Sequence, residues 1–384
     1  MVCTGKGKIM SRLGDVCIVV SGSTPNTSIG EYWDGDIKWI TPAELNEDSF
    51  YITDSVRHIT EQGKNKAGLT YMPVGTVILS SRAPIGKTAI AGCEMCCNQG
   101  FKNLICSERI YNEYLYFFLK SKTDFLNSLG RGATFKELSK SIVENIDIPL
   151  PAYEIQKQIS IQMRQIESLI SLRKQQLSKL DELVKSRFIE MFIGQGYPTK
   201  TVDEVSLVKG EYGAQSASIE YDPSRPRYVR ITDINDDGTL NNDFVSSINP
   251  MDDEQYRLEY GDFMFARMGA TVGKTYAFIE GNQIFAGYLI RYKLNQKLIN
   301  PRYLYWYTRL DEYWNWVKLN QSGAAQPGIN AKKYGSLQVP VPPMELQKQF
   351  ASFVEQTDKS KFEIQKSLEK LETLKKALMQ KYFG

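Results

Sequence analysis

Two stretches of this chain are nearly the same: Ile148-Pro-Leu-Pro-Ala-Tyr-Glu-Ile-Gln-Lys-Gln158 and Val339-Pro-Val-Pro-Pro-Met-Glu-Leu-Gln-Lys-Gln349. Each opens a long helical pattern, which ends near Phe192 in the first copy and near Phe383 in the second. The copies lie 191 residues apart (339 minus 148), which is half of the 384-residue chain. Solenoid repeats are far shorter, about 20–50 residues, so the repeating unit is a whole domain plus a helix. A chain with two similar halves suits a target that is itself bipartite.

The composition is that of a soluble globular protein with room for two domains, since 42% of the residues are hydrophobic and 24% are charged. No apolar run approaches the roughly 20 residues that span a bilayer, and the first 20 residues lack a signal-peptide pattern. All six cysteines lie in the first half, so we expect reduced thiols and a cytoplasmic location. The net charge of +3 gives little support for nucleic-acid binding, which would have to rest on local basic clusters.

We expect an α+β fold with two similar mixed, strand-rich domains, at 1–150 and 193–340, separated by two long helices at 151–192 and 341–384. β-Branched runs at 16–20, 76–79 and 88–91 predict strands in the first domain. Helical spacing predicts a helix over about 111–128, ending in a glycine cap at Gly130. The second domain repeats this order, and three anchors match: Gly75–Arg82 with Gly261–Arg267, Tyr114–Phe118 with Tyr303–Tyr307, and Gly132-Ala133 with Gly323-Ala324.

The long helices carry apolar residues on alternating steps of four and three, which is a heptad pattern. In the first helix the stripe contains one charged residue, Arg173, and in the second it is interrupted by Lys361 and Lys375. Two such helices in one chain predict an antiparallel coiled coil, and about 38 residues at 1.5 Å per residue give a rod of about 57 Å that acts as a spacer. The alternative is that each helix lies on its own domain. The two stripes are Ile159, Met163, Ile166, Ile170, Arg173, Leu177, Leu180 and Val184, and Phe350, Val354, Thr357, Lys361, Ile364, Leu368, Leu371 and Lys375.

Two motifs with a known chemistry are incomplete here. Cys93, Cys96 and Cys97 invite a zinc site, but too few further ligands accompany them and the second half has no cysteine, so buried thiols in a strand are favoured. The run 269–275 resembles a phosphate-binding loop but is one residue short. The sequence also contains no catalytic constellation, because it has one histidine, no Gly-x-Ser-x-Gly elbow and none of the Asn/Asp-Pro-Pro-Tyr/Phe motif of adenine methyltransferases.

Candidate DNA contacts fall in glycine-containing loops, where the backbone can approach a ligand closely. An arginine–lysine pair recurs in both halves, which predicts phosphate or guanine-edge contacts. Solvated surface charge and plain turn structure are the alternatives. Amides can read adenine, and a Pro-rich loop of the second half adds three arginines. The candidates are Ser81, Arg82, Lys87, Asn98, Gln99, Arg131 and Thr134 in the first half, and Arg225, Arg227, Arg230, Arg267, Lys274 and Gln321 in the second.

An ordered set of motifs resembles the specificity (S) subunits of type I restriction–modification systems. The resemblance covers essentially the whole chain, although the second half lacks the opening motif and has Phe285-Ala-Gly287 in place of Asn98-Gln-Gly100. The motifs of the first half are Ser21-Gly-Ser-Thr-Pro25, Tyr32-Trp-Asp-Gly-Asp-Ile-Lys-Trp-Ile-Thr-Pro42, Ile59-Thr-Glu-Gln-Gly63, Ser80-Ser-Arg-Ala-Pro-Ile-Gly86, Asn98-Gln-Gly-Phe101 and Gly130-Arg-Gly-Ala-Thr134, followed by the Pro-Leu-Pro start of the long helix.

The resemblance implies two target recognition domains, each reading one half of a bipartite DNA sequence. It also implies docking of two methyltransferase (M) subunits and possibly two restriction (R) subunits, which would carry S-adenosylmethionine, ATP and magnesium, with no cofactor or metal in this non-catalytic chain. The Gln-rich helix starts are the candidate docking region: Gln156, Gln158, Gln347 and Gln349. A self-contained DNA methyltransferase or nuclease, and a coiled-coil scaffold without a DNA role, remain the alternatives.

Overall fold

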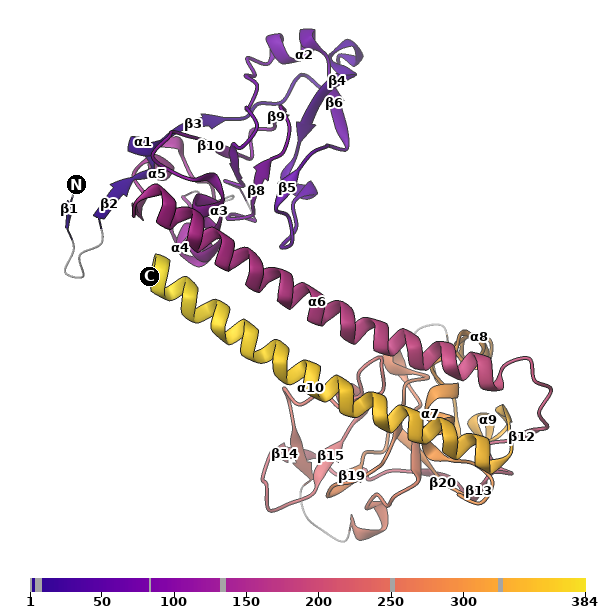
Figure 1. Cartoon of the computed structure of the whole chain (residues 1–384). Coiled ribbons are helices and arrows are strands. Elements are labelled where there is room, and N and C mark those ends of the chain that lie inside the picture. The colour runs from indigo at the N-terminus through magenta and orange to yellow at the C-terminus, as the bar shows by residue number, and fades with distance from the viewer. Residues whose placement is uncertain (1, 4–8, 83, 132–135, 249–252, 324–326) are drawn as a thin grey trace. The chain divides into compact units, whose positions relative to one another are not determined.

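The computed structural model describes residues 2–3, 9–82, 84–131, 136–248, 253–323 and 327–384 (Figure 1). The chain forms two compact units. Unit 1 comprises residues 1–174 and 366–384, and unit 2 comprises residues 175–365. Each unit therefore contains one strand-rich domain together with parts of both long helices, so the predicted boundaries at 151 and 341 mark where helices begin rather than where the compact units divide.

Unit 1 is built on a five-stranded sheet in the order β3-β10-β7-β8-β5, antiparallel except for the β5–β8 pair. Both faces of this sheet are covered. Val77 and Leu79 of β7 face a core that includes helix α3, while Ile78 between them faces a second core with Phe101, because successive side chains of a strand point to opposite faces. The strands are β3 Cys17–Ser21, β5 Tyr51–Ile52, β7 Val77–Leu79, β8 Thr88–Ala91 and β10 Lys102–Cys106.

Two smaller sheets and five short helices complete the domain of unit 1. One sheet has the order β6-β4-β9 and the other β1-β2-β11. Their strands are β1 Val2–Cys3, β2 Ile9–Arg12, β4 Trp33–Ile40, β6 Arg57–Ile59, β9 Cys96–Cys97 and β11 Asp147–Pro149. The helices are α1 Leu13–Val16, α2 Glu61–Lys66, α3 Asn112–Ser121, α4 Thr123–Leu129 and α5 Lys140–Glu144.

The strand predictions at 16–20, 76–79 and 88–91 are confirmed by β3, β7 and β8. The single helix predicted over 111–128 is instead two helices, α3 and α4, which meet at Lys122. Gly130 is the C-cap of α4, which confirms the predicted glycine cap, and its backbone there is extended, with φ −61° and ψ 130°. A Cβ at this position would lie 2.8 Å from Ile85 Cδ1, so a larger residue would make the end of the Ile85 side chain shift.

Unit 2 repeats the plan with sheets β13-β20-β17-β18, β14-β16-β15-β19 and β12-β21. Its central strand β17 again alternates, with Phe263 and Phe265 in one core and Met264 in another. The strands are β12 Thr199–Thr201, β13 Ser206–Tyr212, β14 Ser218–Glu220, β15 Arg227–Val229, β16 Ser246–Ile248, β17 Asp262–Ala266, β18 Thr275–Ala277, β19 Gln283–Phe285, β20 Leu289–Leu294 and β21 Gln338–Pro340. The short helices are α7 Pro301–Tyr307, α8 Asp311–Asn320 and α9 Ala331–Gly335.

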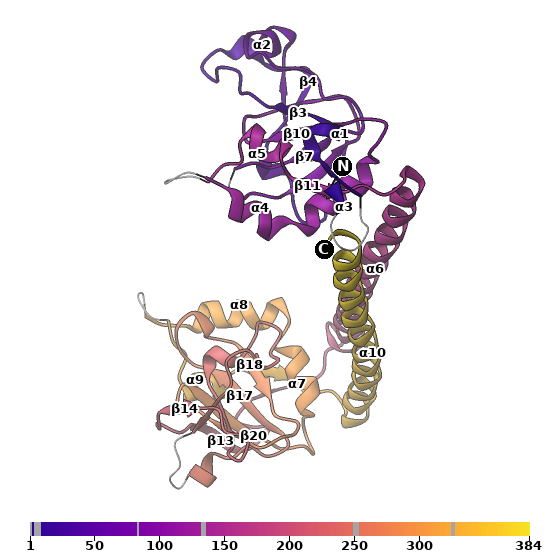
Figure 2. The ribbon, with the colours of Figure 1, turned by 90° about the vertical axis from the view of Figure 1, so that its left-hand side faces the viewer.

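The predicted long helices are α6, Tyr153–Phe192, and α10, Met344–Phe383, and the two views show them side by side within each unit (Figures 1 and 2). They run antiparallel. In unit 1, Gln162 bonds to Tyr382, and Glu167 Oε1 lies 2.6 Å from Lys375 Nζ. In unit 2, Asp181 pairs with Lys361. The predicted antiparallel pairing is thus confirmed, while the supercoil that the heptads predict stays a prediction.

The heptad stripes are the buried faces of these helices, because none of their sixteen predicted positions is exposed. The alternative that each helix lies on its own domain describes only the first turns. Ile159 and Met163 of α6 lie in the core of unit 1, but Phe188 and Phe192 near its end lie in the core of unit 2. Likewise Phe383, at the end of α10, packs in unit 1.

Candidate nucleic-acid interface

In unit 1 a charged cluster forms where three segments pair side by side. The backbone of Glu137 bridges to both Arg82 and Arg131. Its carboxylate accepts from Arg82 Nε at 3.0 Å and from Lys102 Nζ at 3.2 Å. Burial opposes ionisation of Glu137, but the hydrogen bonds from these two cations outweigh it and lower the pKa of this carboxyl below its ordinary value. Arg82, Lys102 and Glu137 therefore form a charged triad with two cations and one anion. Its net positive charge suits a contact with DNA.

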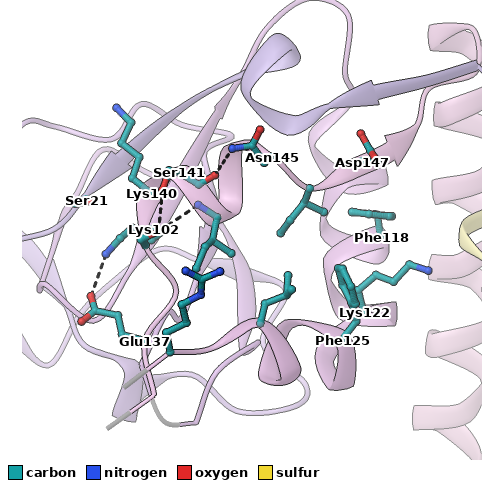
Figure 3. A pocket seen from close by; sticks show the side chains of 15 residues that line it. Ser21, Lys102, Phe118, Lys122, Phe125, Glu137, Lys140, Ser141, Asn145 and Asp147 are labelled. Carbon is teal, nitrogen blue, oxygen red and sulfur yellow. Dashed lines mark hydrogen bonds and ion pairs between the residues drawn. The ribbon is translucent and has the colours of Figure 1, made fainter. Parts of the chain in front are cut away.

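A pocket of about 1170 Å³ opens beside this triad (Figure 3). Lys102, Glu137, Lys140, Asn145 and Asp147 are among its lining residues, and the close-up shows Lys102 directed toward Glu137. Arg131 also lines it and is exposed. The pocket thus brings Arg131, a sequence candidate, together with Lys102 and Glu137, which the sequence did not single out. Lys102 is hard to find because it lies in an apolar strand and is itself buried.

In unit 2, Arg267 directly follows strand β17 and has aromatic neighbours. Arg267 Nε donates to the carbonyl of Gly287 at 3.2 Å. Its guanidinium carbon lies 5.0 Å from the ring centroid of Tyr212 and 5.3 Å from that of Tyr288, within the range of a cation–π contact. The sequence pattern did not indicate either tyrosine, because the equivalent positions of the first half carry no tyrosine.

The backbone hydrogen bonds correct the predicted match between Arg82 and Arg267. Ser81 N donates to Gly100 O, and Arg267 N donates to Tyr288 O. Leu138 N donates to Ser81 O, as Ile329 N does to Arg267 O, both at 2.9 Å. Arg267 therefore corresponds to Ser81, and a shift of one residue along a strand moves a side chain to the other face. The predicted arginine recurrence is wrong.

The lysine recurrence is real, but its cause is structural. Lys87 Nζ donates to the carbonyl of Leu45 at 2.6 Å, and Lys274 Nζ donates to that of Ile234 at 3.1 Å. Each of these carbonyls directly follows a short 3₁₀ helix, Pro42–Glu44 or Ile231–Asp233. Lys274 also pairs with Asp236 at 2.8 Å. Both lysines hold a turn in place, so their recurrence does not support DNA contact.

Ser81 is a second correction. It is fully buried, and its hydroxyl has no hydrogen-bond partner among the described residues. It cannot contact DNA as the chain is folded. Asn98 is half-buried, and its side-chain oxygen accepts from Gly100 N at 2.8 Å, which makes it a turn residue. Gln99 is exposed and bonds to Thr24, and Gln321 is exposed at the end of α8, so these two amides are accessible. Thr134 lies outside the described residues.

The three arginines of the Pro-rich loop each have partners within the chain. Arg225 pairs with Asp222 at 3.2 Å. Arg227 bonds to Asn242 at 2.8 Å, and Arg230 makes two bonds to Asp233, at 2.8 and 3.2 Å. An arginine so engaged must give up these partners, or share them, to bind DNA. The structure therefore gives these arginines a role in ordering the loop.

The predicted docking glutamines divide into two kinds. Gln156 and Gln347 are fully buried. Gln156 accepts from Tyr111 N and donates to the carbonyls of Arg109 and Pro151, all within 3.0 Å. Gln347 makes the equivalent three bonds in unit 2. These two side chains do not reach a partner, so their assignment to docking is wrong. Gln158 and Gln349 are exposed, and their docking role stays a prediction.

The residues that the structure describes give no support for a metal site or a membrane-spanning helix. Across those ranges no group of three or more His, Cys, Asp or Glu side chains could hold a metal ion. Cys96 and Cys97 are buried in β9, and burial raises the pKa of Cys97 to about 12, so it is a thiol at neutral pH. Among the described helices, none is long and apolar enough to cross a membrane.

Comparison with known proteins gives a consistent result. A family model described as the type I restriction modification DNA specificity domain matches residues 6–182 and again residues 199–376. The specificity subunit of the type I restriction enzyme MjaIX of Methanocaldococcus jannaschii is 27% identical over 97% of this chain and 91% of its own length. That of HindI of Haemophilus influenzae is 26% identical over 48% of this chain and 41% of its own.

Two solved structures share the fold. The type I restriction–modification S subunit of M. genitalium superposes with a TM-score of 0.61 at 14% identity, covering 100% of this chain and 98% of that one. A chain from work on complex assembly and conformational transition of the type I restriction–modification system gives 0.63 at 18% identity, covering 98% of both. At these identities the likeness concerns the fold.

Proposed function

The chain belongs to the type I restriction–modification DNA specificity family, as a specificity subunit with two copies of the family's domain, and from this premise we propose that each copy reads one half of a bipartite DNA target. Specificity subunits of this family bind DNA and assemble with other subunits. The proposal concerns how this chain divides that work between its two domains.

The observation that carries the proposal is a shared scaffold with different surface chemistry. Tyr114 and Tyr303 occupy equivalent places, donating to the carbonyls of Pro149 and Pro340 at 2.8 and 3.0 Å. By contrast, the side chains at several equivalent places of this framework differ in charge and size. The hydrogen-bond register pairs Lys102 with Ile290, Arg131 with Ser322, Glu137 with Gly328 and Ser81 with Arg267. Two domains that keep one framework and change these groups are suited to reading two different sequences.

The long helices offer a surface for partner subunits. Ile161, Leu169 and Leu172 of α6 are 53%, 44% and 51% exposed, and at 100° per residue they fall on one side of the helix. This side is distinct from the buried heptad stripe. We assign to it the docking of a methyltransferase subunit through an apolar helix face. The complete assembly would contain two M subunits, which two R subunits can join. The helices would then also set the length of the unread spacer between half-sites.

The chemistry is assigned to the partners. S-adenosylmethionine would bind to the M subunits, and ATP and magnesium to the R subunits, while this chain supplies sequence choice without catalysis. The low net charge of +3 fits this division, because partner subunits can neutralise much of the DNA backbone. A self-contained methyltransferase would have to show turnover of S-adenosylmethionine by the isolated chain. A DNA-free scaffold would have to show no sequence preference in the presence of its M subunit.

The test is a genome-wide map of methylated adenines in the source cell, with this gene intact, deleted and restored. Loss of a single bipartite motif on deletion, and its return on restoration, is the expected result. The partner M gene must be shown to be expressed in all three strains, since its loss would imitate the effect. An unchanged map in cells with active M subunit would overturn the proposed function.

A further inference from the structure

The candidate cations of this protein differ in whether they are already engaged. Arg82, Arg225 and Arg230 each pair with a carboxylate of their own domain. Arg267 differs, because within the described residues no carboxylate lies in ion-pair range of it and its two terminal amino groups donate no hydrogen bond. An arginine in an ion pair must break or share that pair to contact a base, which costs free energy. Arg267 has no such pair to lose.

Arg267 is nonetheless held in position. Its backbone is fixed on both sides, because its N–H donates to Tyr288 O at 3.1 Å and its carbonyl accepts from Ile329 N at 2.9 Å. The Nε–Gly287 bond fixes one edge of the guanidinium, and its carbon lies near the rings of both Tyr212 and Tyr288. The residue is half-buried, while the two tyrosines are 42% and 54% exposed. The group is therefore ordered at the surface of unit 2, with its terminal N–H donors available.

We propose that Arg267, flanked by Tyr212 and Tyr288, is the guanine-reading residue of unit 2. A guanidinium presents two parallel donors that match O6 and N7 of guanine in the major groove, and no other base offers two acceptors there. Fixing the guanidinium before binding reduces the conformational entropy that the contact costs. The two tyrosine rings lie within cation–π range of the guanidinium and help to orient it.

Unit 1 lacks the side chains that form this arrangement in unit 2. The hydrogen-bond register places Ser81 where unit 2 has Arg267 and Gly100 where it has Tyr288. The strand pairing places Ser21 where unit 2 has Tyr212. None of these side chains can hold or replace a guanidinium. The arginine with its two tyrosines is thus a property of one half, as expected for a group that chooses sequence rather than one that maintains the fold. This inference rests on the proposed function, since it assumes that unit 2 reads DNA.

The experiment uses the complex of this chain with its M subunit and duplexes containing the methylated motif. Each base pair of both half-sites is replaced in turn, and binding is measured at fixed salt for the wild type, Arg267→Ala and Arg267→Lys. In the wild type, replacing one G·C pair of one half-site should weaken binding about 5- to 150-fold. Both variants should lose that discrimination and keep the discrimination at the other half-site. Arg267→Lys retains the charge without the paired donors, so it separates base reading from phosphate attraction.

Arg257→Ala is the matched control, because Arg257 is an arginine of the same unit that is engaged with Glu254, and it should leave the discrimination intact. If Arg267→Ala lowers the affinity for every duplex evenly, Arg267 contacts phosphate and the inference is overturned. It is also overturned if discrimination at every G·C pair survives in a variant whose thermal unfolding matches the wild type. If the wild-type complex itself shows no sequence preference, the proposed function fails, and that result is distinct from either of the others.

Discussion

Gln156 makes the most exacting test of how the long helix is fixed to unit 1. Its buried amide joins three backbone groups, at Arg109, Tyr111 and Pro151. Replacing it with leucine, which has a similar volume, removes all three hydrogen bonds and leaves one N–H and two carbonyls without this partner. A buried polar group left unsatisfied costs about 1–3 kcal/mol. Since some of the groups can relax toward water, we expect a loss of about 2–5 kcal/mol in the stability of unit 1.

The assay is native-state hydrogen exchange of the full chain, because it reports the two units separately where a single unfolding curve would combine them. Gln156→Leu should speed exchange in the domain of unit 1 by about 30-fold or more, since 2 kcal/mol corresponds to about that factor, and leave unit 2 unchanged. Gln158→Leu is the matched control, because Gln158 is exposed on the same helix and a surface change costs within about 0.5 kcal/mol. If the two variants exchange alike, the buried amide is not what fixes the helix.

Three further predictions concern other parts of unit 1. Phe383→Ala should destabilise unit 1 by about 3–5 kcal/mol, because this ring is buried in its core. Leu374→Ala, at a position 47% exposed, should have little effect in the same exchange assay, and equal effects would remove Phe383 from the core. Glu137→Gln should cost roughly 1 kcal/mol after allowing for solvent screening. Because the folded pKa of Glu137 is lowered, this contribution is complete above the ordinary carboxyl pKa of about 4.3 and is lost as the pH falls through the lower folded value. Urea titrations at pH 7 and below pH 4 check it, and a difference between wild type and variant that does not shrink in acid would contradict the ion-pair account. Leu172→Asp should weaken assembly with the M subunit at least tenfold in a pull-down titration, whereas Gln165→Glu on the same exposed face should not. Equal assembly by both would move the docking surface elsewhere.

The fold was largely predictable because its main signals are local. The Pro-Leu-Pro and Pro-Val-Pro starts locate the long helices to within a few residues of Tyr153 and Met344, and the heptad spacing identifies their buried faces. The break at Lys122 between α3 and α4 was not predictable from spacing, because the apolar pattern continues through it. Gly130 was predicted as the helix cap and is one, but its extended backbone, which sequence spacing does not reveal, differs from the usual left-handed glycine cap.

The site was less predictable because it depends on contacts between distant segments. Tyr212 and Tyr288 meet Arg267 only through the pairing of strands far apart in the chain. Gln156 could have been assigned correctly, since it precedes Ile159 and Met163 of the buried stripe by three and seven residues, which places it on the buried face. The polarity of Gln156 favours a surface role, but its position in the helical pattern places it on the buried face.

In a duplicated protein, a residue that recurs in both halves therefore indicates a structural contact. The sequence first suggested the opposite, that recurrence indicates DNA contact. Lys87 and Lys274 recur because each holds the same turn, and the buried helix-start glutamines recur because each fixes the same junction. A scaffold used twice must keep these contacts in both copies, whatever DNA each copy reads. Groups that choose sequence have the opposite requirement, because two domains with the same reading groups would read the same half-site. Accessible positions whose residue differs between the two halves, such as Arg267 with Tyr212 and Tyr288, are therefore where substitutions should change the recognised sequence without unfolding the domain.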